Sequence, residues 1–255
     1  MIKNSRWAEI RESKSVMTHD QVKISYDHYK ANHKKVIVIA HGFFNSKQSF
    51  LLQSLGKELI EDYDVVLLDF RGHGKSGGFF YWTTKEHVDL IAVLEILKKD
   101  YDNIGIVGFS LGGSTSIIAA NKTDLIDTLV CVGSPCDFDK IEYHVWDMDI
   151  ENDILYNLTE EGKVGKGVRP GPFWLKKEKP IDCVDCLKCP ILFLHGEKDW
   201  LIRPKHSRNL YKKANTKKDI VTFKDGPHAE YLLRENKNKK KVVDLVRSWL
   251  KETLT

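Results

Sequence analysis

The chain has 255 residues, of which 42% are apolar and 30% are charged, and its formal net charge is +4. This length fits one large α/β domain with a sizeable core. The charges are scattered along the chain, which argues against a nucleic-acid-binding face, and no stretch approaches the roughly 18 uncharged apolar residues of a membrane span.

The N-terminal residues are charged throughout and contain no apolar core of a signal peptide, so none is expected. The five cysteines are an odd number and do not form the pattern of a disulfide framework. Reduced thiols and a cytoplasmic location are therefore expected.

The first part of the chain, residues 6–30, is expected to form a lead-in hairpin without a helix, with a turn near His19 and Asp20. Six short, continuously apolar runs follow, as in strands buried on both faces. They cover residues 35–40, 64–69, 103–108, 128–133, 190–196 and 219–223.

Helical spacing appears between these runs. The segment 49–61 carries Leu52, Leu55 and Leu59 on one face. The segment 83–99 is expected to carry Val88, Ile91 and Ile96 on roughly one apolar face and to begin with a capping box of Thr83 and Glu86. The segment 240–252 aligns Val242, Val246, Trp249 and Leu250, and the basic run 234–241 before it predicts a solvated helix start.

Strands that alternate with helices predict an α/β fold with a mainly parallel sheet covered by helices on both faces. With the lead-in hairpin the sheet has eight strands. The alternation is interrupted once, after the sixth strand, by about 50 residues rich in charge, glycine and aromatics. We expect a core of residues 1–136 and 186–255, with a small cap or lid at 137–185.

A pentapeptide, Gly-Phe-Ser-Leu-Gly, lies between a predicted strand and a predicted helix, with Ser110 between Gly108 and Gly112. It fits G-x-S-x-G, in which a tight turn holds the serine out as a nucleophile and leaves no room for side chains at the flanks. In this context a nucleophile is favoured over a simple glycine-rich turn.

An acid and a base follow in chain order. Asp199 stands a few residues after one predicted strand, and His228 follows the next in a glycine-proline turn. The order Ser110, Asp199, His228, each after its own strand, predicts a catalytic triad.

With these motifs the chain resembles the α/β-hydrolases from about residue 20 onward. The segments that carry the resemblance are AHGF (40–43), DFRGHGKSGG (69–78), GFSLGG (108–113), HGEKD (195–199) and GPH (226–228). The chain looks most like small bacterial esterases of the cinnamoyl/feruloyl esterase kind, with monoacylglycerol-lipase-like and serine-aminopeptidase-like members close behind.

The resemblance implies a role for each site residue. Ser110 attacks the acyl carbon, His228 transfers its proton, and Asp199 orients the imidazole. The backbone N–H groups of Phe43 and Leu111 would form the oxyanion hole. Asp137 and Asp139, after the sixth strand, are the alternative positions for the acid.

Several aromatic residues are expected to line the substrate pocket, although packing of the insertion alone would also explain those within it. They are Phe44, Trp146, Phe173, Trp174 and Trp200, and Tyr143, Met148 and Tyr156 add to the apolar surface of the insertion. No cofactor and no metal are expected. The cysteines at 183, 186 and 189 have a spacing that could bind zinc or an iron–sulfur cluster, but they lack an obvious fourth ligand and are expected to be incidental thiols.

Three histidines in motif turns, His41, His73 and His195, are expected to hold loops by hydrogen bonds, and Asp69 and Arg71 are expected to be structural. The expected activity is hydrolysis of short-to-medium acyl or aryl carboxylic esters through an acyl-serine. Alternatives are a thioesterase, an amidase or peptidase, and a non-catalytic binding protein of the same fold. Dehalogenase and epoxide hydrolase chemistry would need an aspartate at position 110. The expected partner is a small-molecule ester, and we allow for a homodimer.

Overall fold

A computed structural model describes residues 4–141 and 167–254. Its elements follow the expected alternation of strands and helices. In chain order they are α1 (Asn4–Glu9), β1 (Arg11–Met17), β2 (Lys23–Tyr29), β3 (Lys35–Ala40), α2 (Phe50–Leu59), β4 (Asp64–Leu68), α3 (Glu86–Leu97), β5 (Asn103–Phe109), α4 (Leu111–Ala120), β6 (Thr128–Val132), η1 (Phe138–Lys140), η5 (Pro180–Asp182), η6 (Val184–Cys186), β7 (Ile191–Gly196), α6 (Lys205–Lys213), β8 (Lys218–Phe223), η7 (Ala229–Leu233) and α7 (Asn236–Thr253).

The eight strands form one sheet in the order β1-β2-β4-β3-β5-β6-β7-β8. The first two strands form the expected hairpin and β2 pairs with β4, both antiparallel, whereas the pairs from β4 to β8 are all parallel. The mainly parallel, eight-stranded α/β sheet is therefore confirmed, and each of the six predicted central strands lies within one residue of its expected bounds at either end.

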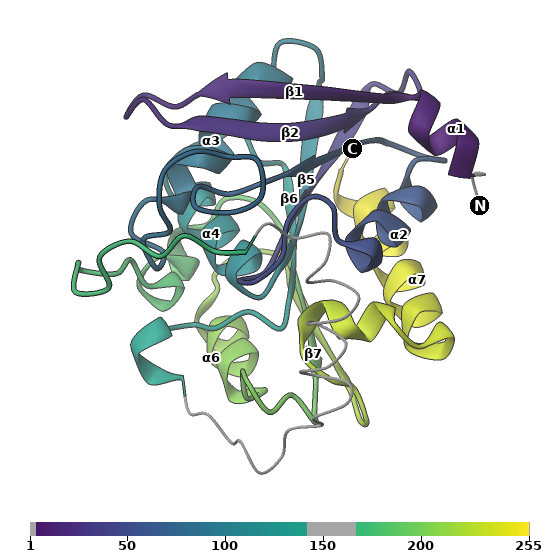
Figure 1. The fold of residues 1–255 in the computed structure, drawn as a ribbon. Coiled ribbons are helices and arrows are strands. Elements are labelled where there is room, and N and C mark those ends of the chain that lie inside the picture. The colour runs from purple at the N-terminus through teal and green to yellow at the C-terminus, as the bar shows by residue number, and fades with distance from the viewer. Residues whose placement is uncertain (1–3, 142–166, 255) are drawn as a thin grey trace.

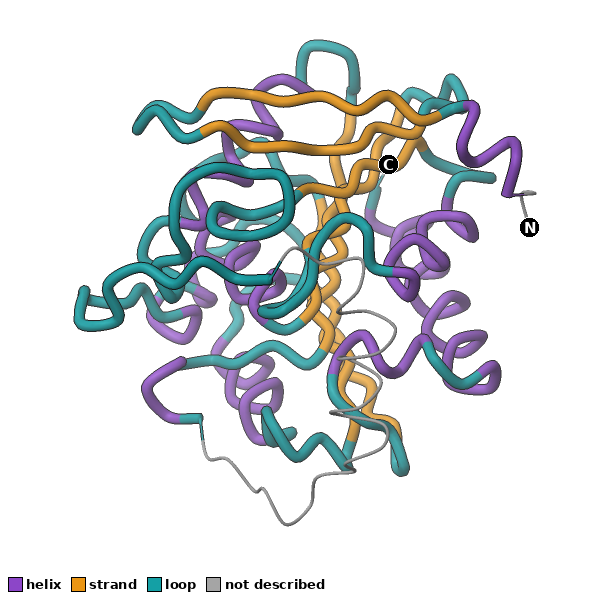
Figure 2. Tube along the Cα trace, in the orientation of Figure 1, coloured by secondary structure: helices purple, strands orange, loops and turns teal. Residues whose placement is uncertain are grey.

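Helices cover both faces of the sheet, because successive strand side chains point to opposite faces. Ile37 and Ile39 of β3 pack in one core with α1, α2 and α7, whereas Val36 and Val38 pack in the other with α3, α4 and α6. Figure 1 shows the sheet nearly edge-on between these two helix layers, and Figure 2 shows the strands running between them.

The predicted faces of α2 and α7 are confirmed, because Leu52, Leu55 and Leu59 and the four named residues of α7 are all buried. The predicted face of α3 is wrong. Its buried apolar residues are Leu90, Ala92, Val93, Leu94 and Leu97, while Val88, Ile91 and Ile96 are only half-buried. This helix is apolar on most of its surface, so spacing alone could not select the side that meets the sheet.

The start of α3 also differs from its prediction. The helix begins at Glu86, whose carboxylate accepts hydrogen bonds from the backbone N–H groups of Tyr81 and Thr83. The Thr83 hydroxyl does not cap the helix but donates to the carbonyl of Glu178 instead. Only the glutamate half of the capping box is therefore formed.

The absence of a helix before the hairpin was also a wrong expectation, since α1 covers Asn4–Glu9. Its six residues are too few for a stable isolated helix. Tertiary packing stabilises it, because the Trp7 indole stacks on the Tyr29 ring with 3.7 Å between centroids and lies against Gly56 of α2.

Candidate active site

The predicted site residues lie beyond the carboxyl ends of four parallel strands. The loop of Phe43 follows β3, Ser110 follows β5, Asp199 follows β7 and His228 follows β8. From β3 the sheet order runs to β4 on one side and to β5 on the other, so the loops after β3 and β5 flank the point where the order reverses. Open α/β sheets bind ligands in this crevice.

Ser110 sits on a sharp turn between β5 and α4. Its backbone has φ 48° and ψ −114°, a conformation that is strained for a side chain other than glycine. A Cβ atom added to Gly108 would lie 2.6 Å from Cα of Gly113, and one added to Gly112 would lie 2.2 Å from the carbonyl oxygen of Ala40. The two glycines therefore permit the turn, as the motif predicted.

Asp199 and His228 lie together. Nδ1 of His228 donates to Oδ2 of Asp199 at 2.7 Å, and Oδ1 of Asp199 accepts from the backbone N–H groups of Leu201 and Ile202. Burial by itself raises the pKa of Asp199, but its bonds and charge interactions with His228 and His195 lower it to about 2. The carboxylate is thus ionised and accepts a hydrogen bond from the proton on Nδ1. In the neutral imidazole, Nε2 is then the ring nitrogen that carries no proton.

The alternative acids lie elsewhere. Asp137 pairs with Lys179 at 3.0 Å, and Asp139 pairs with Lys177 at 2.6 Å. The acid hydrogen-bonded to His228 is Asp199.

The loop after β3 is held by His41. The backbone N–H of Phe70 donates to Nε2 of His41, so the ring proton is on Nδ1, which donates to the carbonyl of Gly42 at 2.6 Å. Burial lowers the pKa of His41 to about 4, against that hydrogen bond, so the ring is neutral. Because the peptide bond is trans, the N–H of Phe43 points away from the carbonyl of Gly42.

The second expected oxyanion-hole donor, Leu111, is the first residue of α4. An N–H in the first turn of a helix has no partner within that helix. The close approach of Gly112 to Ala40 brings this helix start against the loop that carries Phe43. The two expected donors thus lie on adjoining segments.

Neighbouring loops are tied down by buried ionic and polar groups, as expected for Asp69 and Arg71. The Arg71 guanidinium pairs with Asp20 and Asp89, and Asp69 accepts from the backbone N–H groups of Lys47 and Lys75. Two of the motif histidines also hold loops. His73 bonds the carbonyl of Arg71. His195 bonds the hydroxyl of Ser207 and the carbonyl of Ile202.

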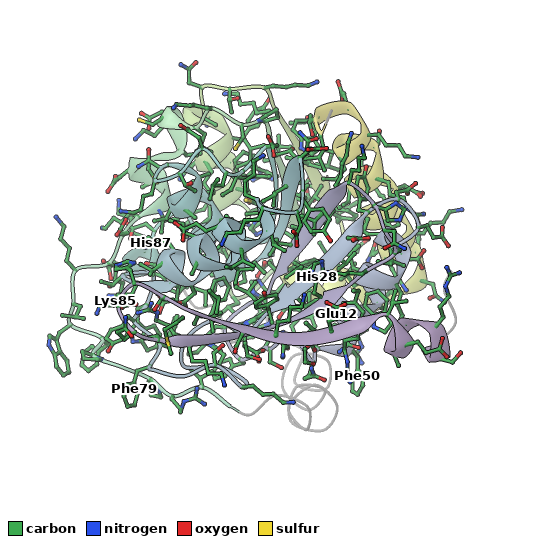
Figure 3. All side chains as sticks on the ribbon, turned by 90° about the horizontal axis from the view of Figure 1, so that it is seen from above. Glu12, His28, Phe50, Phe79, Lys85 and His87 are labelled. Carbon is green, nitrogen blue, oxygen red and sulfur yellow. The ribbon has the colours of Figure 1, made fainter. Side chains whose placement is uncertain are left out.

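The expected pocket residues differ in their exposure. Phe44, Phe173 and Trp174 are exposed by 69%, 67% and 74%, and Trp200 is half-buried. Trp146 lies outside the described residues, as do Tyr143, Met148 and Tyr156. Phe50 and Phe79, which the sequence did not suggest, are also more than half exposed, and Figure 3 shows both along the lower edge of that view.

Phe43 lies half-buried in an aromatic cluster that the sequence did not predict. Its ring centroid is 4.9 Å from that of Phe80, 5.3 Å from that of Trp82 and 4.2 Å from that of Phe44. Apolar surface therefore adjoins the loop after β3. The only sequence signal was the aromatic run at 79–82.

The cysteines at 183, 186 and 189 are half-buried, exposed and buried, respectively. Within residues 4–141 and 167–254 no group of three or more His, Cys, Asp or Glu side chains is arranged to hold a metal ion. Nor is any helix in those ranges long and apolar enough to cross a membrane.

A family model described as the alpha/beta hydrolase fold matches residues 35–153. Across the whole chain the structure is similar to the esterase Pf2001 of Pyrococcus furiosus, with a TM-score of 0.77 and 20% identity, covering 100% of this chain and 97% of that one. The chain has the α/β-hydrolase fold. A second α/β-hydrolase neighbour, the esterase EaEST of Exiguobacterium antarcticum, has a TM-score of 0.71 and 16% identity, covering 94% of this chain and 100% of that one.

The chain also matches curated proteins, but only over part of its length and of theirs. It is 26% identical to the uncharacterized protein YqkD of Bacillus subtilis over 76% of its own chain and 64% of YqkD. It is 30% identical to the esterase YbfF of Escherichia coli over 43% of its own chain and 41% of YbfF. The chain thus matches less than two thirds of the length of these relatives.

Proposed function

We propose that this α/β-hydrolase is a serine esterase that cleaves short-to-medium acyl or aryl carboxylic esters through an acyl-serine intermediate. The observation that carries the proposal is the 2.7 Å bond between His228 and Asp199 at the same sheet edge as the strained turn of Ser110. An imidazole fixed by a buried carboxylate and a serine on a tight turn are the parts that nucleophilic acyl transfer requires.

In the proposed reaction Oγ of Ser110 attacks the acyl carbon while Nε2 of His228 takes the hydroxyl proton. His228 then gives that proton to the leaving alkoxide, and an alcohol departs. Water attacks the acyl-serine in the same way, His228 again serving as base and then as acid, and a carboxylic acid is released. Asp199 stays ionised throughout and stabilises the imidazolium.

The negative charge on the carbonyl oxygen would be bound by the N–H groups of Phe43 and Leu111. His41 supports this role because its bond to the Gly42 carbonyl turns the Phe43 N–H the other way. One such donor contributes about 3 kcal/mol to lowering the barrier.

We further propose that residues 137–185 form a cap beside the site and that the exposed aromatics Phe44, Phe173 and Trp174 meet the acyl or aryl group. Trp146 and Trp200 belong to the same proposed pocket. The names of Pf2001, EaEST and YbfF as esterases support ester hydrolysis as the activity.

The test is hydrolysis of p-nitrophenyl esters from acetate to decanoate and of a cinnamoyl ester, by the wild type, Ser110→Ala and Ser54→Ala. Ser54 donates to the carbonyl of Leu51 in α2 and is the matched control. Activity lost only in Ser110→Ala supports the proposal, and the preferred chain length reports the depth of the pocket. If the wild type cleaves only a thioester or a p-nitroanilide, the enzyme is a thioesterase or an amidase. If a fluorophosphonate does not label Ser110 either, the catalytic proposal is wrong.

A further inference from the structure

Two residues beyond His228 a second carboxyl group, that of Glu230, is buried at the site with an exposed fraction of 5%. Burying a carboxyl group costs several kcal/mol unless its environment compensates. One oxygen, Oε1, accepts a hydrogen bond from the side-chain amide of Asn45, whereas Oε2 has no partner among the described residues. The triad and the proposed oxyanion hole do not account for this group.

The carboxyl group of Glu230 fills the space beside Gly42 and the nucleophile. A Cβ atom added to Gly42 would lie 3.2 and 3.3 Å from the two carboxyl oxygens and 3.4 Å from Cβ of Ser110. Asn45 belongs to the same loop, because its backbone N–H donates to the carbonyls of Gly42 and Phe43. Glu230 is thus wedged between the loop after β3 and the base of the serine turn.

The backbone between His228 and Glu230 is held in an unusual conformation. Ala229 has φ +38°, a region that favours glycine, and a Cβ atom on Gly133 would lie 2.9 Å from its backbone. Such strain persists only where surrounding contacts impose it. Here the strained conformation lets the two neighbours of Ala229 reach separate partners, His228 toward Asp199 and Glu230 toward Asn45.

Burial raises the pKa of Glu230, against the opposing attraction of His228. The group therefore keeps its proton to higher pH than an exposed glutamate. Since glutamine has the same shape, stays neutral and keeps an oxygen that accepts from Asn45, it is the close substitute for the protonated acid.

We propose that Glu230 is a positioning residue for the reaction, joining the loop of the proposed oxyanion hole to the loop of the base through Asn45. This inference rests on the proposed serine esterase function. Because the two loops come from strands far apart in the sheet, a direct link between them sets the Phe43 N–H relative to His228. Misplacement by about 1 Å can cost a hundredfold in rate.

The experiment compares kcat and KM, per serine labelled by a fluorophosphonate, for Glu230→Ala, Glu230→Gln, Asn45→Ala and the double alanine variant. We expect Glu230→Ala and Asn45→Ala each to lower kcat about 10- to 100-fold with little change in KM. A misplaced donor weakens binding of the transition state more than binding of the substrate. Glu230→Gln is expected to restore most of the rate. The double variant should be no slower than the slower single variant, since each breaks the same link.

The matched control is Asp64→Asn, another buried carboxyl group, which accepts from the backbone of Ala31 and His33 at the opposite end of the sheet. It should change the melting temperature but not kcat per labelled serine. Unchanged kcat in Glu230→Ala, or additive losses in the double variant, would overturn the positioning role while leaving the esterase proposal intact. A wild type that neither hydrolyses esters nor reacts with the fluorophosphonate overturns both.

Discussion

Nδ1 of His228 lies 2.7 Å from Oδ2 of Asp199, although 29 positions separate the two residues in the chain. Parallel strands β7 and β8 bring them together, because the loops that follow adjacent parallel strands leave the sheet at the same edge. The carboxylate is wholly buried and takes two further hydrogen bonds from backbone N–H groups, so it can hold one tautomer of the imidazole.

Asp199→Asn should therefore lower kcat about ten-thousandfold while the protein stays folded, because an amide in this position favours the wrong imidazole tautomer. The rate is measured on the best p-nitrophenyl ester, and folding by circular dichroism. Asp137→Asn is the control, since Asp137 pairs with Lys179. Loss of activity in Asp137→Asn rather than in Asp199→Asn would show that Asp137, after β6, is the catalytic acid.

The buried histidines should stabilise the fold less as the pH falls from 6.5 toward 4. Burial lowers the pKa of His28 and His41 to about 4 and that of His73 to about 3, all from 6.5. Below pH 6.5 these imidazoles bind protons in the unfolded chain but not in the folded one, so their protonation favours unfolding. Each histidine should account for about 2 kcal/mol between pH 6.5 and 5.

The urea midpoint at pH 7 and pH 5 measures this effect. His28→Gln should reduce the difference between the two midpoints, whereas substitution of the exposed His19 should not. If His28→Gln leaves the difference between the two midpoints unchanged, His28 takes up its proton in the folded state and the prediction is wrong.

Gly112→Ala should destabilise the protein and abolish activity together. Its Cβ atom would meet the carbonyl oxygen of Ala40 at 2.2 Å, and a backbone atom cannot rotate away as a flexible side chain can. Melting temperature and ester hydrolysis are the measurements. Gly77→Ala is the control, because the atom nearest to its Cβ, the carbonyl oxygen of Lys23, would lie 3.6 Å away. Equal behaviour of the two variants would argue against the close approach of α4 to the loop after β3.

Leu90→Ala should lower the free energy of unfolding by about 2 to 5 kcal/mol, as expected for a large side chain removed from a packed core. Leu90 is fully buried against the sheet, whereas Ile91 is only partly buried. Ile91→Ala should cost less, and urea denaturation measures both. A larger loss of unfolding free energy in Ile91→Ala would show that α3 packs on the sheet with the face that the sequence pattern predicted.

The differences between expectation and structure have a common cause. Six residues at Asn4–Glu9 become a helix because Trp7 finds Tyr29, which lies on the far strand of the hairpin. The face of α3 was ambiguous because most of its positions are apolar. Glu230 was not predicted from the sequence, because a single charge within the run AEYLL is only a weak signal of burial.

Local patterns suffice for the eight-stranded α/β sheet, for the turn at Ser110 and for the order of serine, acid and base, because strand burial, glycine spacing and loop position depend on neighbouring residues. The pairing of Asp199 with His228, the wedge of Glu230 between two loops and the choice of buried helix faces depend on distances across the sheet. Those distances exist only after the strands have assembled, since residues far apart in sequence meet only in the folded chain.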